Sequence, residues 1–226
     1  MFVHNQPALV INKTLVIADL HIGITGDLYK SGISIPSQVK KMAEIINKMK
    51  KKTGAKNLII LGDIKHKVPG TSWTESKEIP DFLSQLKFKN IIIVKGNHDG
   101  LIEKMVNKTV KVKKFVIVDN YFLTHGHRNI KTKQKTIVIG HNHPHVKFID
   151  EMGGRFTEPV WLIGKLKGGK KIIVMPAFNE LSGAIVVNEQ PMIGPIAKCI
   201  LKKQTHAFLL DGTDLGTLDD LKIKDG

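Results

Sequence analysis

The segment Leu58-Ile59-Ile60-Leu61-Gly62-Asp63-Ile64-Lys65-His66 joins an apolar run to a short polar motif. Four consecutive apolar residues that end at a glycine are typical of a strand buried on both faces, as in a parallel sheet covered by helices. The polar motif follows at once, so we expect its carboxylate and imidazole groups at the edge of that sheet. The segment therefore predicts an α/β fold and also the position of a site within it.

Four further segments repeat this arrangement along the chain. Each contains histidine and directly follows a run rich in β-branched residues, so all five motifs would project from one edge of a sheet. An isolated histidine is usually a surface residue or a satisfied core residue, but five in the same context are hard to obtain by chance. The four segments are Asp19-Leu20-His21, Gly96-Asn97-His98-Asp99, His125-Gly126-His127 and Gly140-His141-Asn142-His143.

The sequence around the motifs predicts a fold of several layers. Residues 36–52 carry an apolar stripe at helical spacing with lysines on the other face, and a second helix is expected around residues 78–86. We predict a four-layer α/β/β/α sandwich of two mixed sheets flanked by helices, in one domain over residues 1–226. Residues 68–75 are predicted to form a mobile loop. The predicted strands are 8–11, 14–19, 58–61, 91–94, 115–118, 121–124, 136–139, 146–149, 160–163, 171–175, 184–187 and 207–210.

The polar residues of the five motifs form a set of metal ligands without a thiolate. Seven donors exceed what one tetrahedral zinc ion uses, but they suit two adjacent ions that share a carboxylate. Two ions about 3.5–4 Å apart can hold a phosphate and make hydroxide available at neutral pH. We therefore expect two divalent ions; manganese suits the set best, and zinc, iron and nickel remain alternatives. The seven donors are Asp19, His21, Asp63, Asn97, His125, His141 and His143.

Composition limits where the protein is expected to act. No apolar stretch approaches the roughly 20 residues that a membrane span needs, and the first residues lack the pattern of a signal peptide. Cys199 is the only cysteine, so an intrachain disulfide is excluded, which fits a reducing compartment. We expect a cytoplasmic protein without a membrane partner.

The net charge of +15 predicts a polyanionic partner. Clustered lysines and arginines attract a polyanion and bind it by releasing counterions, although a lysine-rich surface that only maintains solubility is an equally good interpretation. The run from Arg128 to Lys135 directly follows the motif at His125, so His127, Arg128 and Lys131 are candidate substrate-binding residues. With two Trp and two Tyr the chain offers little aromatic surface for base stacking. This composition favours contacts to backbone phosphates, and DNA is a candidate partner.

The five motifs resemble those of the calcineurin-like metallophosphoesterase superfamily over residues 14–187. That family carries D-x-H, G-D-x-x-[DH], G-N-H-[DE], an isolated H before a small residue, and G-H-x-H, in this order. The details are similar to those of small phosphoesterases related to SbcD-type nucleases, including the ones associated with DNA ligases. Three segments carry this narrower resemblance: Asp19-Leu20-His21-Ile22-Gly23, His141-Asn142-His143-Pro144 and Met175-Pro176-Ala177-Phe178-Asn179-Glu180-Leu181-Ser182-Gly183.

The resemblance implies a role for each ligand and for three further residues. His98 is expected to protonate the leaving oxygen, and Asp99 to orient its ring. His66 stands where many phosphomonoesterases have Asp, which favours phosphodiesters. For the ions, the resemblance implies that Asp63 bridges, that one ion is held by Asp19, His21 and His143, and that the other is held by Asn97, His125 and His141.

The leading hypothesis is a dinuclear phosphodiesterase in which a hydroxide between the ions attacks phosphorus, with a DNA repair nuclease as its narrower form. A general phosphatase or a small cyclic-nucleotide phosphodiesterase would need the same centre without the positive surface. A nucleic-acid-binding scaffold with a vestigial site is the alternative outside the enzymes, but the complete ligand set argues against it. The sequence leaves the substrate, the metal, the oligomeric state and the protein partners open.

Overall fold

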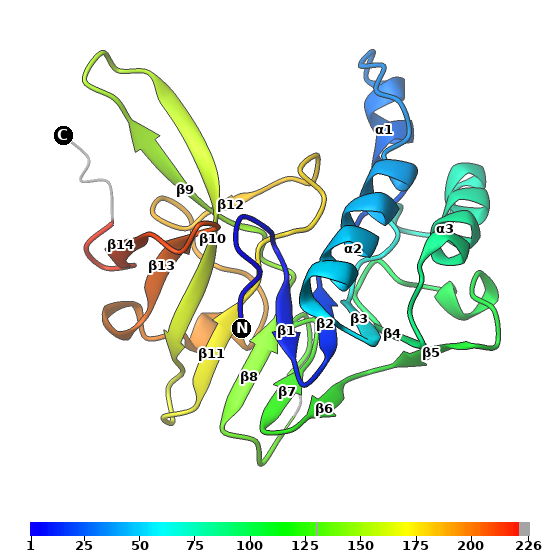
Figure 1. Cartoon of the computed structure of the whole chain (residues 1–226). Coiled ribbons are helices and arrows are strands. Elements are labelled where there is room, and N and C mark those ends of the chain that lie inside the picture. The colour runs from blue at the N-terminus through cyan, green and yellow to red at the C-terminus, as the bar shows by residue number, and fades with distance from the viewer. Residues whose placement is uncertain (130, 222–226) are drawn as a thin grey trace.

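In the computed structural model, which describes residues 1–129 and 131–221, the first half of the chain forms a five-stranded sheet (Figure 1). β1 and β2 are antiparallel, and Asn12 and Lys13 between them both have positive φ, as a type I′ hairpin turn requires. The other neighbours are parallel. The strands lie in sequence order: β1 (Leu9–Ile11), β2 (Thr14–Ile17), β3 (Asn57–Leu61), β4 (Asn90–Val94) and β5 (Val110–Lys113).

Two helices cover one face of this sheet, and the second sheet covers the other face. The longer helices are α2 (Val39–Thr53) and α3 (Trp73–Gln85). Ile60 of β3 is buried among side chains of these helices, whereas its neighbour Ile59 is buried against the second sheet. Since successive side chains of a strand point to opposite faces, both faces of β3 are covered, and this explains its all-apolar sequence.

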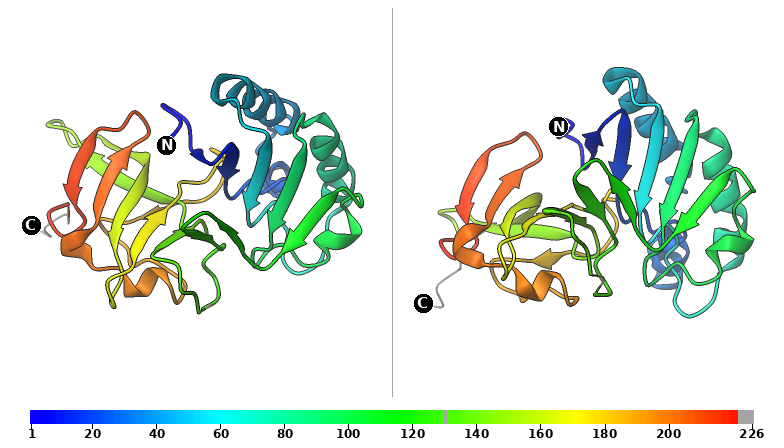
Figure 2. Two further views of the ribbon diagram at one scale, coloured as in Figure 1. Left: turned by 60° about the horizontal axis from the view of Figure 1, so that its bottom comes forward. Right: turned by 90° about the horizontal axis from the view of Figure 1, so that it is seen from below.

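The second half of the chain forms a nine-stranded mixed sheet, which Figure 2 shows beside the first one. β8 is parallel to both β7 and β11, and the long strand β10 is antiparallel to β9, β11 and β13. Its strands are β6 (Val116–Val118), β7 (Tyr121–Leu123), β8 (Thr136–Ile139), β9 (Pro144–Ile149), β10 (Arg155–Lys165), β11 (Lys171–Val174), β12 (Ile185–Val186), β13 (His206–Leu209) and β14 (Asp214–Thr217).

The outer face of the second sheet is covered by irregular chain and short 3-10 turns. Met192, Ile196 and Ile200 are buried in one cluster with side chains of β8, β10 and β11. The turns here are η2 (Ala197–Cys199) and η3 (Lys202–Gln204), while η1 (Ile102–Lys104) follows β4. The predicted fold class, mixed α/β with two mixed sheets, is confirmed, with turns in place of helices in this outer layer. Among the described residues, no helix has the length and apolar character needed to span a membrane.

The loop predicted over residues 68–75 is shorter than expected, because α3 begins at Trp73 and not near residue 78. Ser72 and Glu75 form a capping box, a start signal visible in the sequence as Ser-x-x-Glu. The buried Glu75 carboxylate also accepts hydrogen bonds from the backbone N–H groups of His66 and Lys67. The buried Lys65 ammonium donates to the carbonyls of Lys67 and Gly70. The turn is therefore tied to its surroundings by buried charged groups.

Besides the 3-10 turns, two strands and one helix lie outside the sequence prediction. β5 adds a fifth strand to the first sheet, and β14 extends the second sheet beside β13. The helix α1 (Ile24–Lys30) follows the first motif directly and has only one buried residue, Ile24. Every predicted strand overlaps an observed one, whereas β5 was missed although its sequence Val-Lys-Val-Lys alternates as a strand with one buried face does.

Candidate metal centre

The five motifs come together in the structure, but they come from two sheets and not from the edge of a single sheet as expected. Asp19, Asp63 and Asn97 follow the parallel strands β2, β3 and β4, so they leave the first sheet at one edge. His125 and His141 follow β7 and β8, which are parallel neighbours in the second sheet. Because the carboxyl ends of parallel strands lie side by side, the polar residues that follow the strands of each sheet lie close together. The residues from the two sheets then meet in one region.

Two groups of three ligands lie next to each other. In the first, Asp19, His21 and His143 have ligand atoms within 4.8 Å of one another, and His143 Nε2 is 3.4 Å from Asp19 Oδ1. In the second, Asp63, His125 and His141 meet the same limit, and His125 Nε2 is 3.2 Å from Asp63 Oδ2.

Asp63 and Asn97 complete this arrangement. His125 Nε2 lies 3.1 Å from Asn97 Oδ1, so Asn97 adjoins the second group. Asp63 Oδ2 is also 4.0 Å from His21 Nε2 of the first group. One carboxylate oxygen therefore faces ligands of both groups, which is the position that a shared ligand needs.

The chemistry of these residues fits a pair of cations. Asp19 Oδ1 is buried and accepts no hydrogen bond within the described part of the chain, an arrangement that is costly for a carboxylate unless a cation is present. Two ligand rings are oriented through Nδ1, which donates to a backbone carbonyl: that of Leu61 at 3.1 Å from His125 and that of Gly183 at 2.6 Å from His143. Such contacts leave Nε2 as the metal-binding atom.

The backbone is strained at the motifs. A positive φ is uncommon outside glycine and costs of order 1–3 kcal/mol per residue. Such residues persist only where the surrounding structure holds them, and they cluster at functional sites. Five of the seven candidate ligands have a positive φ: Asp19 (57°), His21 (43°), Asp63 (48°), His141 (69°) and His143 (39°).

Glycines make room for the buried carboxylates. A Cβ on Gly96 would lie 2.0 Å from Asp63 Oδ1, and one on Gly140 would lie 2.5 Å from Asp19 Oδ2. Gly62 is needed for two reasons, since its φ is +86° and a Cβ would lie 2.1 Å from His125 Nδ1. Gly62 thus allows a turn, whereas Gly96 is needed for close approach and not for the sharp turn that its place after a strand suggests.

Electrostatics keeps most of the ligands in the forms that bind cations. Burial alone would raise the pKa of Asp19, but the nearby charges of His143 and His125 lower it below its usual value. Burial lowers the pKa of His21 to about 3 and that of His141 to about 4, so both rings are neutral. Burial would also lower the pKa of His125, but Asp63 and Asp19 raise it to about 9. A cation at His125 would therefore displace a proton.

His98 is oriented by a backbone carbonyl, which corrects the expected role of Asp99. His98 Nδ1 donates to the His66 carbonyl oxygen, and its Nε2 lies 3.9 Å from Asp63 Oδ2. The buried Asp99 carboxylate instead accepts from the backbone N–H of Gly96 at 2.8 Å and of Lys65 at 3.3 Å. Asp99 therefore joins the loops after β3 and β4 and does not contact the His98 ring.

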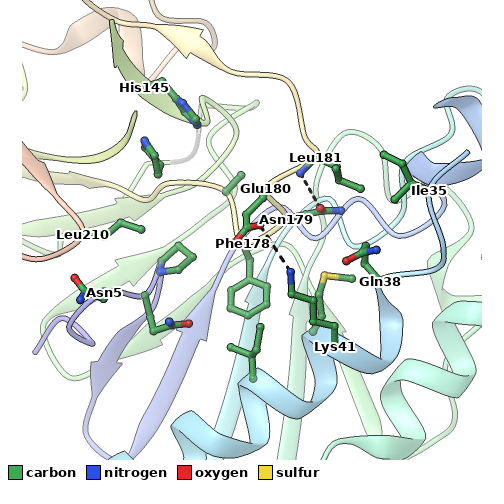
Figure 3. Close-up of a pocket in the computed structure, with 16 residues that line it drawn as sticks. Asn5, Ile35, Gln38, Lys41, His145, Phe178, Asn179, Glu180, Leu181 and Leu210 are labelled. Carbon is green, nitrogen blue, oxygen red and sulfur yellow. Dashed lines mark hydrogen bonds and ion pairs between the residues drawn. The ribbon is translucent and has the colours of Figure 1, made fainter. Parts of the chain in front are cut away.

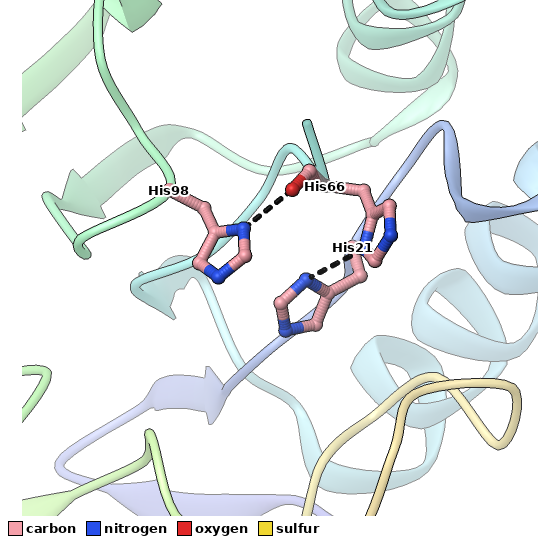
Figure 4. A group of neighbouring side chains, drawn as sticks. All are labelled: His21, His66 and His98. Carbon is pink, nitrogen blue, oxygen red and sulfur yellow. Dashed lines mark hydrogen bonds between the residues drawn. The ribbon is translucent and has the colours of Figure 1, made fainter. Parts of the chain in front are cut away.

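The side chain of His66 lies against another ligand. Figure 4 shows its ring next to His21, where the two Nδ1 atoms are 3.3 Å apart. On its other side, His66 Nε2 is 3.6 Å from Asp27 Oδ2 of α1. Asp27 and its helix were not predicted, and an acidic residue in a short polar helix carries no sequence signal of this contact.

The predicted substrate-binding residues are divided between two pockets. His127 and Arg128 line a pocket of about 520 Å³ together with Gly96, Lys113 and Lys114. Lys131 lines another pocket, of about 410 Å³, with Lys167 and Lys170. The two adjoin at Asn129, and Ile130 lies outside the described residues. The basic run therefore does not face a single groove, which the continuous sequence could not reveal.

The segment around Phe178 supports the first motif from outside. Phe178 N donates to the Ala18 carbonyl at 2.8 Å, and Asn179 Nδ2 donates to the Leu20 carbonyl at 2.8 Å. Figure 3 shows the pocket that adjoins this segment, of about 390 Å³, with Lys41 paired to Glu180 at 3.9 Å. Buried Asn179 thus fixes the strained turn at Asp19, a function that its polar type in an apolar segment could have indicated.

Comparison with known proteins gave one family and several solved structures. The family described as "Calcineurin-like phosphoesterase" matches residues 13–184, well over half of the chain. No curated protein matches the chain significantly.

Three similar structures illustrate the range. The Pseudomonas putida nuclease MPE has 20% identity and a TM-score of 0.57, with 88% of this chain and 85% of that chain covered. Yfce, a phosphoesterase from E. coli, has 18% identity and a TM-score of 0.44, with 90% and 96% covered. The Aquifex aeolicus protein of unknown function AQ665 has 16% identity and a TM-score of 0.39, with 57% and 77% covered. At 20% identity and a TM-score of 0.57, the first similarity shows a shared fold. The TM-scores of the other two are too low to support a conclusion about this chain.

The position of Asp63 predicts how metal content depends on single residues. Wild-type protein should bind two divalent ions, whereas Asp63→Asn should bind both weakly because one carboxylate oxygen faces both groups. His21→Ala should weaken mainly one ion. Elemental analysis after manganese loading and desalting measures this, and two ions undisturbed in Asp63→Asn would exclude the shared role.

The close approach at Gly96 gives a second prediction. Gly96→Ala places a methyl group against Asp63 and should reduce metal content in a protein that remains folded by circular dichroism. The matched control is Gly100→Ala four residues on, where a Cβ would meet no atom within 4 Å and φ is not positive. Equal metal content in the two variants would show that Asp63 does not need this space.

Proposed function

The chain belongs to the calcineurin-like phosphoesterase family of metal-dependent hydrolases, and we propose that it cleaves phosphodiester bonds at a centre of two divalent ions. One observation carries the proposal: Asp63 Oδ2 lies between the ligand group of His21 and that of His125, at 4.0 Å and 3.2 Å from their Nε2 atoms. A single site would leave half of the buried ligands without a function.

Each part of the chain has a task in this proposal. Bound ions would supply activation of a water molecule and neutralisation of the charge on phosphate. Manganese suits a set of nitrogen and oxygen donors. The ligands proposed for one ion are Asp19, His21 and His143, those for the other are Asn97, His125 and His141, and Asp63 is shared.

His98 is the proposed proton donor to the leaving oxygen. Its Nδ1–H is engaged by the His66 carbonyl, so its Nε2 is the atom that faces the centre, 3.9 Å from Asp63 Oδ2. Its side chain is 27% exposed, which leaves it accessible to a substrate. A positioned histidine with one nitrogen fixed by a carbonyl is suited to carry a proton at the other.

The pocket beside Gly96 favours a nucleic-acid strand as the substrate. Lys95 N donates to the Lys113 carbonyl at 2.8 Å, so the end of β5 lies next to the loop that carries His98. The ammonium of Lys95 is paired with Glu103 at 2.7 Å. Lys113, Lys114 and Arg128 line the same pocket, are exposed, and have no charged partner within the described part of the chain. Three unpaired cations beside the centre suit the phosphates that flank a scissile bond.

DNA is the narrower form of this substrate, and DNA repair is its narrower context. The P. putida protein of the same fold is a nuclease, but a shared fold does not select a substrate. A small diester or a monoester would use the same centre without the pocket. A metal-reconstituted assay with a phosphomonoester, a diester dye, single-stranded DNA and double-stranded DNA separates these substrates.

Replacing His98 should separate catalysis from metal binding. His98→Ala should retain both ions and lose roughly 10²–10⁴-fold in rate, the usual contribution of a positioned proton donor. Rates on the diester dye and metal content are measured on the same samples. A loss of ions together with activity would show that His98 is a ligand.

Neutralising the pocket should affect long substrates selectively. The triple change of Lys113, Lys114 and Arg128 to Gln should weaken DNA binding and cleavage. The slope of log binding constant against log salt concentration should become shallower by up to about 0.9 per lost duplex-phosphate contact. Cleavage of the short dye should stay near wild type.

The matched control removes three charges from α2 by changing Lys48, Lys51 and Lys52 to Gln. These exposed lysines lie near the end of α2 and do not line the pocket, so DNA cleavage should change little. Equal effects of the two triple variants, or equal losses on DNA and dye, would contradict the strand-binding function of the pocket.

A further inference from the structure

The two ring nitrogens of His21 face different partners. Nε2 lies 3.3 Å from His143 Nε2 and 4.0 Å from Asp63 Oδ2, on the side where the ligands converge. Nδ1 lies 3.3 Å from His66 Nδ1, as Figure 4 shows. The His21 side chain is only 5% exposed, so water does not readily replace either partner.

The hydrogen-bonding chemistry of imidazole then constrains both rings. A neutral histidine that binds a cation through Nε2 carries its proton on Nδ1, and this buried N–H needs an acceptor. Among the described residues, His66 Nδ1 is the atom within hydrogen-bond distance of His21 Nδ1. His66 can accept only if its own proton is on Nε2, the nitrogen that faces Asp27 Oδ2 at 3.6 Å.

His66 is held firmly enough to fix a neighbouring ring. Its backbone N–H donates to Glu75 Oε1 at 2.9 Å, and its carbonyl accepts from His98 Nδ1. Glu75 is fully buried and caps α3. The backbone of His66 is therefore fixed independently of its side chain, and the side chain extends from this fixed point to His21.

We propose that His66 is a positioning residue: its Nδ1 accepts the Nδ1 proton of His21, and Asp27 favours the tautomer of His66 that can do so. The inference rests on the proposed two-ion centre. In it, His66 orients the metal ligand His21 and does not act on the substrate. Asp27 is 44% exposed and also pairs with Lys30 at 2.6 Å. Its contribution is therefore smaller than that of His66.

A competing interpretation is a third ion held by the three histidines of Figure 4. His21, His66 and His98 do offer ligand atoms within 4.8 Å of one another. However, His98 Nδ1 is engaged by the His66 carbonyl, and neither of the adjoining carboxylates, Asp27 and Asp63, contacts all three rings. A hydrogen bond between His21 and His66 agrees with the observed Nδ1–Nδ1 contact and leaves the His98 ring bound to the His66 carbonyl.

Two variants of similar size test the proposal through the position of one atom. His66→Asn places an amide oxygen near the position of Nδ1, whereas His66→Gln places it near the position of Nε2. Both retain the carbonyl that orients His98. His66→Gln should weaken one of the two ions by about 10- to 100-fold, the usual effect of losing such a partner, while His66→Asn should remain close to wild type.

Asp27→Asn should weaken the same ion less, and its effect should disappear in the His66→Gln background, because Asp27 acts through His66. Asp81→Asn in α3 is the control for loss of a surface carboxylate. Manganese titration calorimetry gives both affinities for each variant. Equal losses in His66→Asn and His66→Gln, or three ions in the wild-type protein, would overturn the proposal.

Nitrogen NMR of the metal-free protein tests the same contact without any ion. His21 should carry its proton on Nδ1 in the wild-type protein and in His66→Asn, and should shift toward the Nε2–H form in His66→Gln. An identical His21 tautomer in all three proteins would overturn the inference. If the wild-type protein instead bound fewer than two ions, the proposed function would fail, and the NMR result would still decide the role of His66.

Discussion

The burial of two carboxylates, Asp19 and Asp63, beside one another is the constraint on which the rest of the structure depends. Both are almost completely shielded from water, and like charges at such sites are stable only with compensating positive charge or N–H donors. The backbone N–H of His141 donates to Asp19 Oδ2 at 3.0 Å, and that of His98 donates to Asp63 Oδ1 at 2.9 Å. The other oxygen of each carboxylate faces histidines, and this is where cations would provide the missing charge.

The fold tolerates this arrangement because its cores are extensive. The positive φ values at the motifs disfavour folding, and these residues are held in place by apolar layers on both sides of the first sheet. Since ligands that bind only the folded state stabilise it, cations at this centre would offset part of the cost. Structure and chemistry are therefore linked, because the free energy of ion binding would offset the strain that brings the ligands together.

The apolar runs and the ligand types were enough to predict the two sheets and the convergence of the motifs, because both follow from side-chain period and donor chemistry. Contacts that depend on backbone geometry were not predictable. Asp99 follows His98 in sequence, but its carboxylate turns to the backbone N–H groups of Gly96 and Lys65. Arg128 and Lys131 are close in sequence and line different pockets. The boundary of α3 could have been predicted from Ser72 and Glu75, whereas the contact of Asp27 with His66 joins two elements that no local pattern relates.

Crystallography with manganese tests the central claim most directly, because anomalous scattering places each ion without reference to activity. Crystals of the wild-type protein grown with manganese should show two anomalous peaks about 3.5–4 Å apart, as in two-metal phosphoesterase sites. Both peaks should contact the Asp63 carboxylate, with Asp19 and His143 at one and His125 and His141 at the other. A single peak at saturating manganese, or two peaks of which only one contacts Asp63, would contradict the account.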